Sequence, residues 1–251
     1  MKQDAVTAAV ILIGDEILSG RTQDTNLKTI ANFLAPMGIR VCEGRIIADE
    51  RETIVETVRT MSKSYDYVFT TGGIGPTHDD ITAECIAEAF DKPISVRDDA
   101  RRILQDWYAT RDVELTDARL RMARIPDDAT LIDNPVSGAP GFVLENVYVM
   151  AGVPLIMKAM LHNVGPTLDG GVVLSAVELG GEGLKEGDLA TALAELAQNM
   201  PEVSFGSYPW YSEKDHGVRI VARSQKTTLL ETAKVALEQL IRAQGATPFE
   251  L

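Results

Sequence analysis

The glycine-rich run from Thr70 to Thr82 constrains the fold of this chain more than any other segment. It follows the short apolar run Tyr67-Val68-Phe69, which is typical of a strand, and it precedes a helix-like run that continues to Phe90. Glycine allows positive φ and lets the backbone approach a ligand closely, and a helix start offers free N–H groups and a positive dipole end. This order predicts an α/β unit with an anion-binding turn. The residues of the turn that we expect to bind substrate are Thr71, Gly72, Gly73, Gly75, Pro76 and Thr77.

The first half of the chain alternates between strand-like and helix-like segments. The continuous apolar run Ala8–Ile13 is typical of a strand that is buried on both faces, as in a parallel sheet. Further strands are predicted over Ile39–Ile47 and Tyr67–Thr70, and each is followed by apolar residues at helical spacing. Asp24 or Thr25 is placed to cap the first helix. The alternation predicts a three-layer α/β/α domain with a mostly parallel sheet, which we assign to residues 1–168.

The pattern changes along the second half of the chain. We expect strands over 142–144 and 147–150 and helices over 98–111, 116–123 and 154–164. The segment 165–171 contains three glycines and a proline and is the best candidate for a linker. Beyond it the sequence predicts a small α+β domain over 169–251, in the order strand, helix, strand, strand, helix. The predicted elements are strands over 172–179, 203–211 and 218–222 and helices over 186–200 and 227–243.

Charge and cysteine content narrow the class of protein. The formal net charge is −13, and both predicted domains are acidic, which argues against a surface that binds nucleic acid. No apolar run is long enough to span a membrane, and the first residues do not resemble a signal peptide. Cys42 and Cys85 are expected to be buried thiols in a reducing compartment. The sequence therefore predicts a cytoplasmic protein.

Two predicted strands end in loops that carry carboxylates. Gly14-Asp15-Glu16 follows the first strand, and Asp79-Asp80 follows the third. Because ligands bind beyond the carboxyl ends of parallel strands, these acids converge if the two strands are neighbours. Mg²⁺ prefers oxygen ligands, so we predict Asp15, Asp79 and Asp80 as metal ligands, with catalytic roles for Asp79, Asp80 and Glu16. Alternatively, Asp79 or Asp80 is simply the N-cap of the next helix.

A third element is the loop Asn134–Phe142, which contains two prolines and two glycines. Asn134, Ser137, Pro140 and Gly141 are predicted to hold the polar edge of a ligand. The alternative is a purely structural turn between two strands.

Three motifs, in this order, resemble a known family. They are Gly14–Gly20 together with Asn26, Thr71–Thr82, and Asn134-Pro135 with Ala139–Phe142. Together they are similar to the molybdopterin-binding domain of the MoaB/Mog type over roughly residues 5–165. The particular residues of the motifs most resemble those in the N-terminal part of CinA-like proteins, and they are also similar to the extra domain of eukaryotic FAD synthases. The resemblance implies that a KH-like unit follows and adds Gly14 and Asn26 to the substrate-binding residues. The deamidase domain found in CinA-like proteins has no room in 251 residues, so we expect that activity to be absent. The chain departs from the motifs at Ser137-Gly138 and Ala151.

The resemblance implies a pyrophosphatase that depends on a divalent cation (Mg, Mn or Co) and acts on a nucleotide diphosphate such as ADP-ribose or FAD. Two alternatives stay open: a protein that binds or adenylylates molybdopterin, and a non-enzymatic binding module. Gly180-Gly181-Glu182-Gly183 has the G-x-x-G spacing of an RNA-binding loop, but its Glu opposes a phosphate clamp. We therefore expect a small-molecule nucleotide or pterin as ligand and a homodimer or other homo-oligomer, with no membrane or nucleic acid partner.

Overall fold

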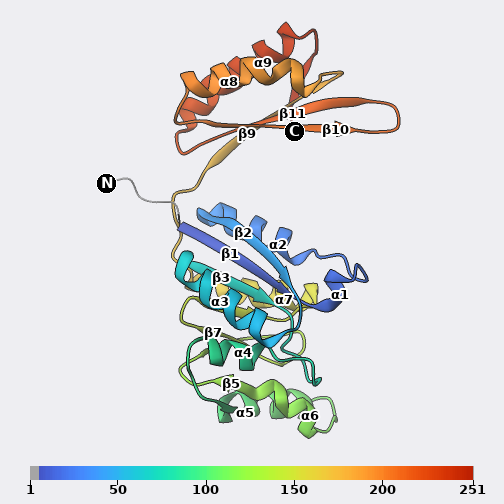
Figure 1. The fold of residues 1–251 in the computed structure, drawn as a ribbon, viewed down its shortest axis with the longest axis vertical. Coiled ribbons are helices and arrows are strands. Elements are labelled where there is room, and N and C mark those ends of the chain that lie inside the picture. The colour runs from blue at the N-terminus through green and yellow to red at the C-terminus, as the bar shows by residue number, and fades with distance from the viewer. Residues whose placement is uncertain (1–5, 251) are drawn as a thin grey trace. The chain divides into compact units, whose positions relative to one another are not determined.

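The computed structural model describes residues 6–250, so the first residues, on which our interpretation of the N-terminus rests, lie outside the described range. The chain divides into two compact units, between Gly171 and Val172 (Figure 1).

A six-stranded sheet forms the centre of the first unit, in the order β2-β1-β3-β8-β7-β6. The first four of these strands run parallel, and β7 and β6 are antiparallel to their neighbours. The strands are β1 (Val6–Ile13), β2 (Ile39–Ile47), β3 (Tyr67–Thr71), β8 (Val147–Met150), β7 (Gly141–Leu144) and β6 (Thr130–Ile132). The predicted mostly parallel sheet is confirmed.

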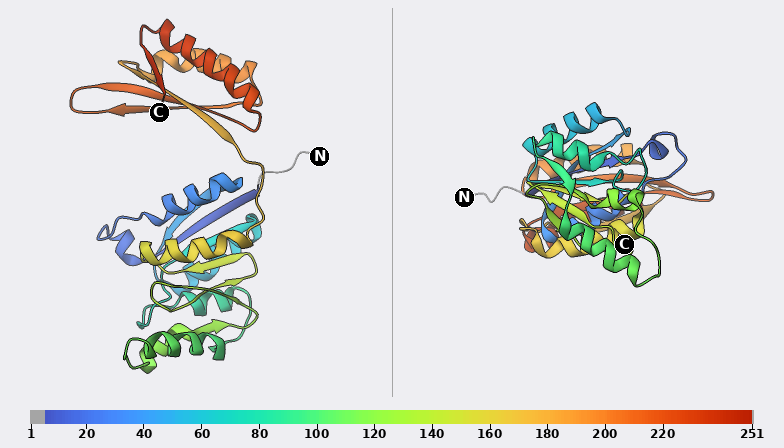
Figure 2. Two further views of the ribbon diagram at one scale, coloured as in Figure 1. Left: turned by 180° about the vertical axis from the view of Figure 1, so that it is seen from behind. Right: turned by 90° about the horizontal axis from the view of Figure 1, so that it is seen from below.

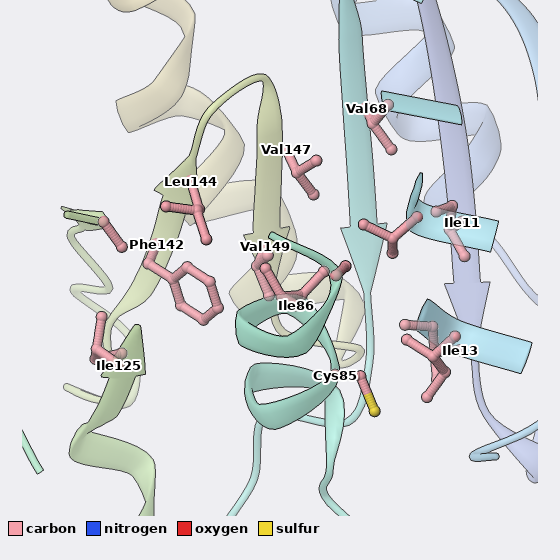
Figure 3. Packing of buried hydrophobic residues seen from close by; sticks show 14 of the residues in the cluster. Ile11, Ile13, Val68, Cys85, Ile86, Ile125, Phe142, Leu144, Val147 and Val149 are labelled. Atoms are coloured by element: carbon pink, nitrogen blue, oxygen red, sulfur yellow. The ribbon is translucent and has the colours of Figure 1, made fainter. Parts of the chain in front are cut away.

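Helices cover both faces of this sheet. Alternate residues of β1 point to opposite sides: Ala9, Ile11 and Ile13 belong to one buried cluster, and Ala8, Val10 and Leu12 belong to another. The first cluster packs under α3 (Arg51–Ser64), α4 (Thr82–Ala89) and α5 (Asp98–Ala109). Figure 3 shows Ile86 and Cys85 of α4 over the strands. The second cluster packs under α2 (Asn26–Leu34) and α7 (Pro154–Val164), which lie in front of the sheet in the left view of Figure 2. The three-layer architecture follows, because β1 can bury both faces only between two helix layers.

Shorter elements complete the first unit. A two-stranded sheet of β4 (Ile94–Val96) and β5 (Arg124–Pro126) brackets the segment that contains α5 and α6 (Asp117–Leu120). The remaining pieces are α1 (Asp15–Leu18) and the 3₁₀ turns η1 (Ala35–Met37), η2 (Arg121–Ala123) and η3 (Gly165–Thr167). The sequence did not predict β4, β5 or β6.

The second unit is a four-stranded antiparallel sheet, in the order β10-β11-β9-β12. Its elements are β9 (Ser175–Glu182), α8 (Glu186–Asn199), β10 (Ser204–Tyr211), β11 (His216–Ser224), α9 (Thr227–Ala243) and β12 (Pro248–Glu250). Both helices pack on one face of the sheet through a shared core that includes Leu189 of α8 and Leu237 of α9. Gly180, Gly181 and Glu182 lie inside β9, so the G-x-x-G spacing is not a phosphate-clamping loop.

The structure also bears on the two cysteines and on membrane-spanning segments. Cys85 is buried, but Cys42 is exposed on β2, so the prediction that both thiols are buried is wrong for Cys42. The cause is the position of β2 at the edge of the sheet, where its outer residues alternate between solvent and core. Along residues 6–250, no helix combines the length and apolar character that a membrane crossing requires.

Candidate functional site

A cleft of about 570 Å³ lies beyond the carboxyl ends of the parallel strands. Strands β1 and β3 are paired neighbours, with Leu12 opposite Thr71. The chain leaves β1 for α2 on one face of the sheet and leaves β3 for α4 on the other face. The two loops therefore diverge here, and this is the position at which open α/β sheets bind ligands. The convergence predicted from the sequence depended on this pairing, which the structure contains.

The glycines of the turn after β3 are required by the backbone. Gly72 has φ of 107°, and a Cβ there would lie 2.1 Å from the carbonyl oxygen of Ile13. Gly73 has φ of 67°, and a Cβ there would lie 2.1 Å from Oγ1 of Thr82. Thr82 closes the turn, because its amide donates to the carbonyl of Gly73 at 2.9 Å and its hydroxyl donates to the carbonyl of Gly72 at 3.0 Å. The turn therefore packs closely against the end of β1, at the carbonyl of Ile13.

Three consecutive amides in this turn are free to bind an anion. Among the described residues, the N–H groups of Gly73, Ile74 and Gly75 make no hydrogen bond, and all three residues line the cleft. Successive backbone amides around a left-handed residue form a concave anion site. The turn therefore has the geometry of the predicted phosphate cradle, but the amides come from the turn itself and not from the helix.

Asp79 and Asp80 do not cap the helix that follows. Helix α4 begins at Thr82, and its N-cap position is Ile81, which makes no side-chain capping bond. Oδ2 of Asp80 accepts from the amide of Thr77 at 2.9 Å and also from the Thr77 hydroxyl. The Thr77 hydroxyl also lowers the pKa of Asp79, with a smaller contribution from His78. Both carboxylates line the cleft, and the interpretation of this pair as a simple cap is wrong.

Two of the cleft carboxylates fold back over glycines. A Cβ on Gly75 would lie 2.6 Å from Oδ2 of Asp80, and a Cβ on Gly14 would lie 2.6 Å from Oε1 of Glu16. Any larger residue at either glycine would displace the carboxylate. The glycines therefore contribute to the position of the acids as well as to the path of the backbone.

The structure adds Asp49, which the sequence interpretation missed. It follows β2, lines the cleft, and accepts a hydrogen bond from the amide of Asp15 at 3.0 Å. Burial raises the pKa of Asp49, the Asp15 amide opposes that rise, and the charges of Asp15, Glu16 and Asp79 add to it. The rule applied to β1 and β3, a carboxylate just after a strand end, would also have found Asp49.

These acids do not form a ready-made metal cage. Within residues 6–250, no group of three or more His, Cys, Asp or Glu side chains is arranged to hold a metal ion. The side chain of Asp15 is exposed and is not among the residues that line the cleft. The carboxylates that line the cleft are Glu16, Asp49, Asp79 and Asp80. They fit a cation that takes part of its coordination from a ligand, because Mg²⁺ is usually bound by one or two carboxylates plus substrate phosphates.

The loop between β6 and β7 is held by Asn134. Its Nδ2 donates to Oγ of Ser137 at 2.6 Å and to the carbonyl of Ala139 at 2.7 Å, and its Oδ1 accepts from the amides of Val136 and Ser137 at 3.1 Å. The side chain amide is thus occupied within the loop. Asn134 therefore shapes the cleft wall, and its predicted contact with a ligand stays a prediction.

Asn26 joins three segments behind the cleft. It is buried, and its Nδ2 donates to the carbonyl of Gly152 at 2.7 Å and to Oγ1 of Thr71 at 3.4 Å. The N-cap position of α2 is Thr25, which makes no side-chain capping bond; the carboxylate of Asp24, one residue earlier, accepts from the first helix amides, those of Asn26 at 3.0 Å and Leu27 at 3.1 Å. Asn26 thus connects Thr71, at the end of β3, to Gly152, which lines the cleft.

The structure gathers most, but not all, of the predicted residues in one place. Those that line the cleft are Gly14, Glu16, Gly72, Gly73, Gly75, Pro76, Asp79, Asp80, Asn134 and Ser137. Pro140 lines a small adjoining hollow. The predicted residues outside both linings are Asp15, Asn26, Thr71, Thr77 and Gly141. Besides Asp49, the sequence interpretation missed Thr22 and Met122, which line the cleft.

Comparison with known proteins identifies the family. The family described as "probable molybdopterin binding domain" matches residues 9–170, and the family described as "FAD synthase, middle domain" matches residues 183–250. The chain belongs to the first of these families, as its motifs predicted.

Relatives support the assignment. A protein of Aeropyrum pernix is 34% identical over 246 residues, which cover 93% of this chain and 90% of that protein. A protein of Metallosphaera sedula is 40% identical over 162 residues, and the match spans 62% of this chain and 61% of that protein. The crystal structure of the protein CinA, of unknown function, from Thermoplasma acidophilum is 36% identical with a TM-score of 0.59 and covers 64% of this chain and 98% of its own. The resemblance to CinA-like proteins is confirmed.

Proposed function

We propose that the cleft binds a divalent cation and hydrolyses the pyrophosphate bond of a nucleotide diphosphate such as ADP-ribose or FAD. The observation that carries this proposal is the placement of three free amides, at Gly73, Ile74 and Gly75, beside four carboxylates in one cleft. Free amides suit a phosphate group, and carboxylates suit a hard cation. The family descriptions, which concern a pterin and a flavin nucleotide synthase, agree with a ligand of this kind.

Each part of the cleft has a role in this reaction. Asp79 and Asp80 would hold the cation, with Oδ2 of Asp80 fixed by Thr77 so that its other oxygen is left for the ion. A bound divalent cation supplies Lewis-acid polarisation of the phosphoryl oxygens. The amides of Gly73 and Gly75 would donate to the phosphoryl oxygens as negative charge develops on them. Glu16, which lines the cleft, would orient the attacking water and accept its proton.

The reaction is a hydrolysis that splits one P–O–P bond. Water adds to one phosphorus, the bridging oxygen leaves with the other phosphate, and the products from ADP-ribose are AMP and ribose 5-phosphate. FAD would give AMP and FMN. Purified protein should therefore release AMP from one of these substrates in the presence of Mg²⁺, Mn²⁺ or Co²⁺, and a chelator should stop it. Failure to hydrolyse either substrate with any of the three cations would refute the proposal.

Substitution of the acids tests the site. Asp79→Asn and Asp80→Asn keep the shape of the side chain but remove the charge that would hold the cation, so both should abolish turnover. Asp112→Asn is a matched control, because Asp112 is an exposed acid outside the cleft, with φ of 53° that Asn tolerates. Full turnover in Asp80→Asn would remove Asp80 from the site.

The alternative is a protein that binds or adenylylates molybdopterin, which the family match over residues 9–170 favours. The cleft also offers an apolar wall, formed by Ala151, Val153, Pro154 and Ile156, that could contact a ring. A titration with molybdopterin separates the two functions. Saturable micromolar binding without hydrolysis of ADP-ribose or FAD would favour the pterin.

A further inference from the structure

Arg121 lies beside the anion-binding turn, in a position that the family resemblance did not single out. It starts the 3₁₀ turn η2 and lines a hollow of about 20 Å³. Gly73, Gly75 and Asp80 line the same hollow, and all three also line the cleft. The hollow is therefore a side extension of the cleft, and Arg121 stands at its wall.

The side chain of Arg121 has no partner within the described residues. Its Nε is buried and makes no hydrogen bond, and no carboxylate of the described chain forms an ion pair with it. The neighbouring arginines differ: Arg124 pairs with Glu84, and Arg119 donates to the carbonyl of Glu114 and lies over the ring of Tyr108. The neighbouring arginines thus make interactions within the fold, and the side chain of Arg121 makes none among the described residues.

A buried, unpaired guanidinium donor costs free energy, so a stable fold rarely keeps one without a reason. The acids beside Arg121 do not satisfy it, because Glu84 is held by Arg124 and Asp80 by Thr77. One water would fill the hollow, since a water needs roughly 10–15 Å³ of such volume. A single water can accept from Nε, but it supplies no negative charge to the guanidinium, which a phosphate would.

The charge of the cleft gives Arg121 a function. Among the described residues that line the cleft there is no Lys, Arg or His, while four of them are acidic. The hollow adds Arg121 and Arg124, and only Arg121 is unpaired. A ligand that carries two phosphates gains from a cationic contact beside the turn, and a guanidinium matches phosphate oxygens in a bidentate fork.

We propose that Arg121 is the cationic contact for a phosphoryl group of the ligand that is bound at Gly73–Gly75. This inference rests on the proposed function, because it names one protein group that holds the diphosphate. It makes Arg121 a binding residue for a diphosphate ligand, whether or not that ligand is then hydrolysed.

Binding of a diphosphate that cannot be hydrolysed tests the inference without any need for turnover. Methylenediphosphonate with saturating Mg²⁺ is titrated into the full chain and into Arg121→Gln, Arg121→Lys and Arg101→Gln. Arg101 is the matched control, because it lies on α5 outside the cleft and the hollow and pairs only with Asp98. Arg121→Gln should weaken binding roughly 10- to 100-fold, as expected for loss of hydrogen bonds from a charged group. The affinity of Arg121→Lys should lie between those of the unaltered chain and Arg121→Gln. Arg101→Gln should bind with the affinity of the unaltered chain.

A direct signal from the unaltered chain guards against a variant that fails to fold. The Nε–H resonance of Arg121, assigned as the signal missing from Arg121→Lys, should shift when methylenediphosphonate is added. An unshifted resonance, or unweakened binding by a folded Arg121→Gln, would overturn the inference and leave a water as the partner of Nε. Weakened binding in a chain that hydrolyses neither ADP-ribose nor FAD would refute the hydrolase and keep the inference.

Discussion

Substitution of Gly72 by alanine tests whether the anion-binding turn is fixed by the close approach of two strand ends. The added Cβ would lie 2.1 Å from the carbonyl oxygen of Ile13, far inside van der Waals contact, and φ at this position is 107°. A positive φ costs a non-glycine residue about 1–2 kcal/mol, and moving the backbone to relieve the overlap costs a further 1–3 kcal/mol or so. The sum, about 2–5 kcal/mol, is a large share of the roughly 5–15 kcal/mol that stabilises a domain.

Gly20 provides the matched control for this substitution. It has φ of 72°, but nothing lies within 4 Å of an added Cβ, so Gly20→Ala should carry the conformational cost alone. Urea unfolding measures both variants. With a slope of about 2 kcal/mol per molar urea, Gly72→Ala should lower the midpoint by roughly 1–2.5 M and Gly20→Ala by less than about 1 M.

The two tryptophans allow the transition of the first unit to be followed by itself. Trp107 lies in the first unit and Trp210 in the second, so fluorescence in a Trp210→Phe background reports on Trp107. If Gly72→Ala is no less stable than Gly20→Ala, the contact between the turn and the end of β1 does not constrain the turn, and the reasoning is refuted.

Three further outcomes are expected. Asp66 accepts from both the amide and the hydroxyl of Thr7 at 2.7 Å, and these bonds lower its pKa, so Asp66→Asn should destabilise the chain at pH 7. That difference should shrink as pH falls below the unfolded pKa of about 4 and close once pH lies below the lowered folded pKa of Asp66, because the carboxylate is then protonated in both states. A difference in melting temperature that persists at the lowest pH would contradict the prediction. Burial raises the pKa of the Cys85 thiol to about 11, so a thiol reagent at pH 8 should label Cys42 quickly and Cys85 only on unfolding, as peptide mapping would show. Gly187→Ala in α8 meets no atom within 4 Å and should stabilise the second unit by about 0.5–1 kcal/mol, measured by its melting temperature.

Long elements with clear ends could be predicted from the sequence closely. Helix α7 begins at Pro154 and ends at Val164 as predicted, because proline is well suited to the first turn of a helix and glycine follows. Helix α9 also has its predicted bounds, Thr227–Ala243, because its apolar residues stay in phase along its length. The three-residue strands β4, β5 and β12 were not predicted. Three residues are too few to show the alternation of apolar and polar residues that marks a strand, and the pairing of these strands depends on distant segments.

The site residues could be predicted where carboxylates lie in the segment that follows a strand. Glu16 lies in the segment after β1 and Asp79-Asp80 lie in the loop after β3, and both segments line one cleft. The alternative that Asp79 or Asp80 is the N-cap of the next helix was wrong, because α4 begins only at Thr82 and its N-cap position is Ile81. Arg121 could not be found from the sequence, because an arginine in a short helical segment looks like any solvated charge until its lack of partners is seen in three dimensions.

The arrangement of charge in the cleft favours joint binding of cation and phosphate over binding of either alone. The free amides at Gly73–Gly75 attract a phosphate, but the carboxylates of Glu16, Asp49, Asp79 and Asp80 repel it. The same carboxylates attract a cation, but no three of them are arranged as a cage, so the ion needs oxygen ligands from elsewhere. A cation bridged to a phosphate removes both difficulties, because each partner supplies what the other lacks. Linkage then requires that the cation strengthens phosphate binding by the same factor as the phosphate strengthens cation binding. Ligands with two adjacent phosphates would gain most from this coupling, which is the physical reason for which we propose a diphosphate as the ligand.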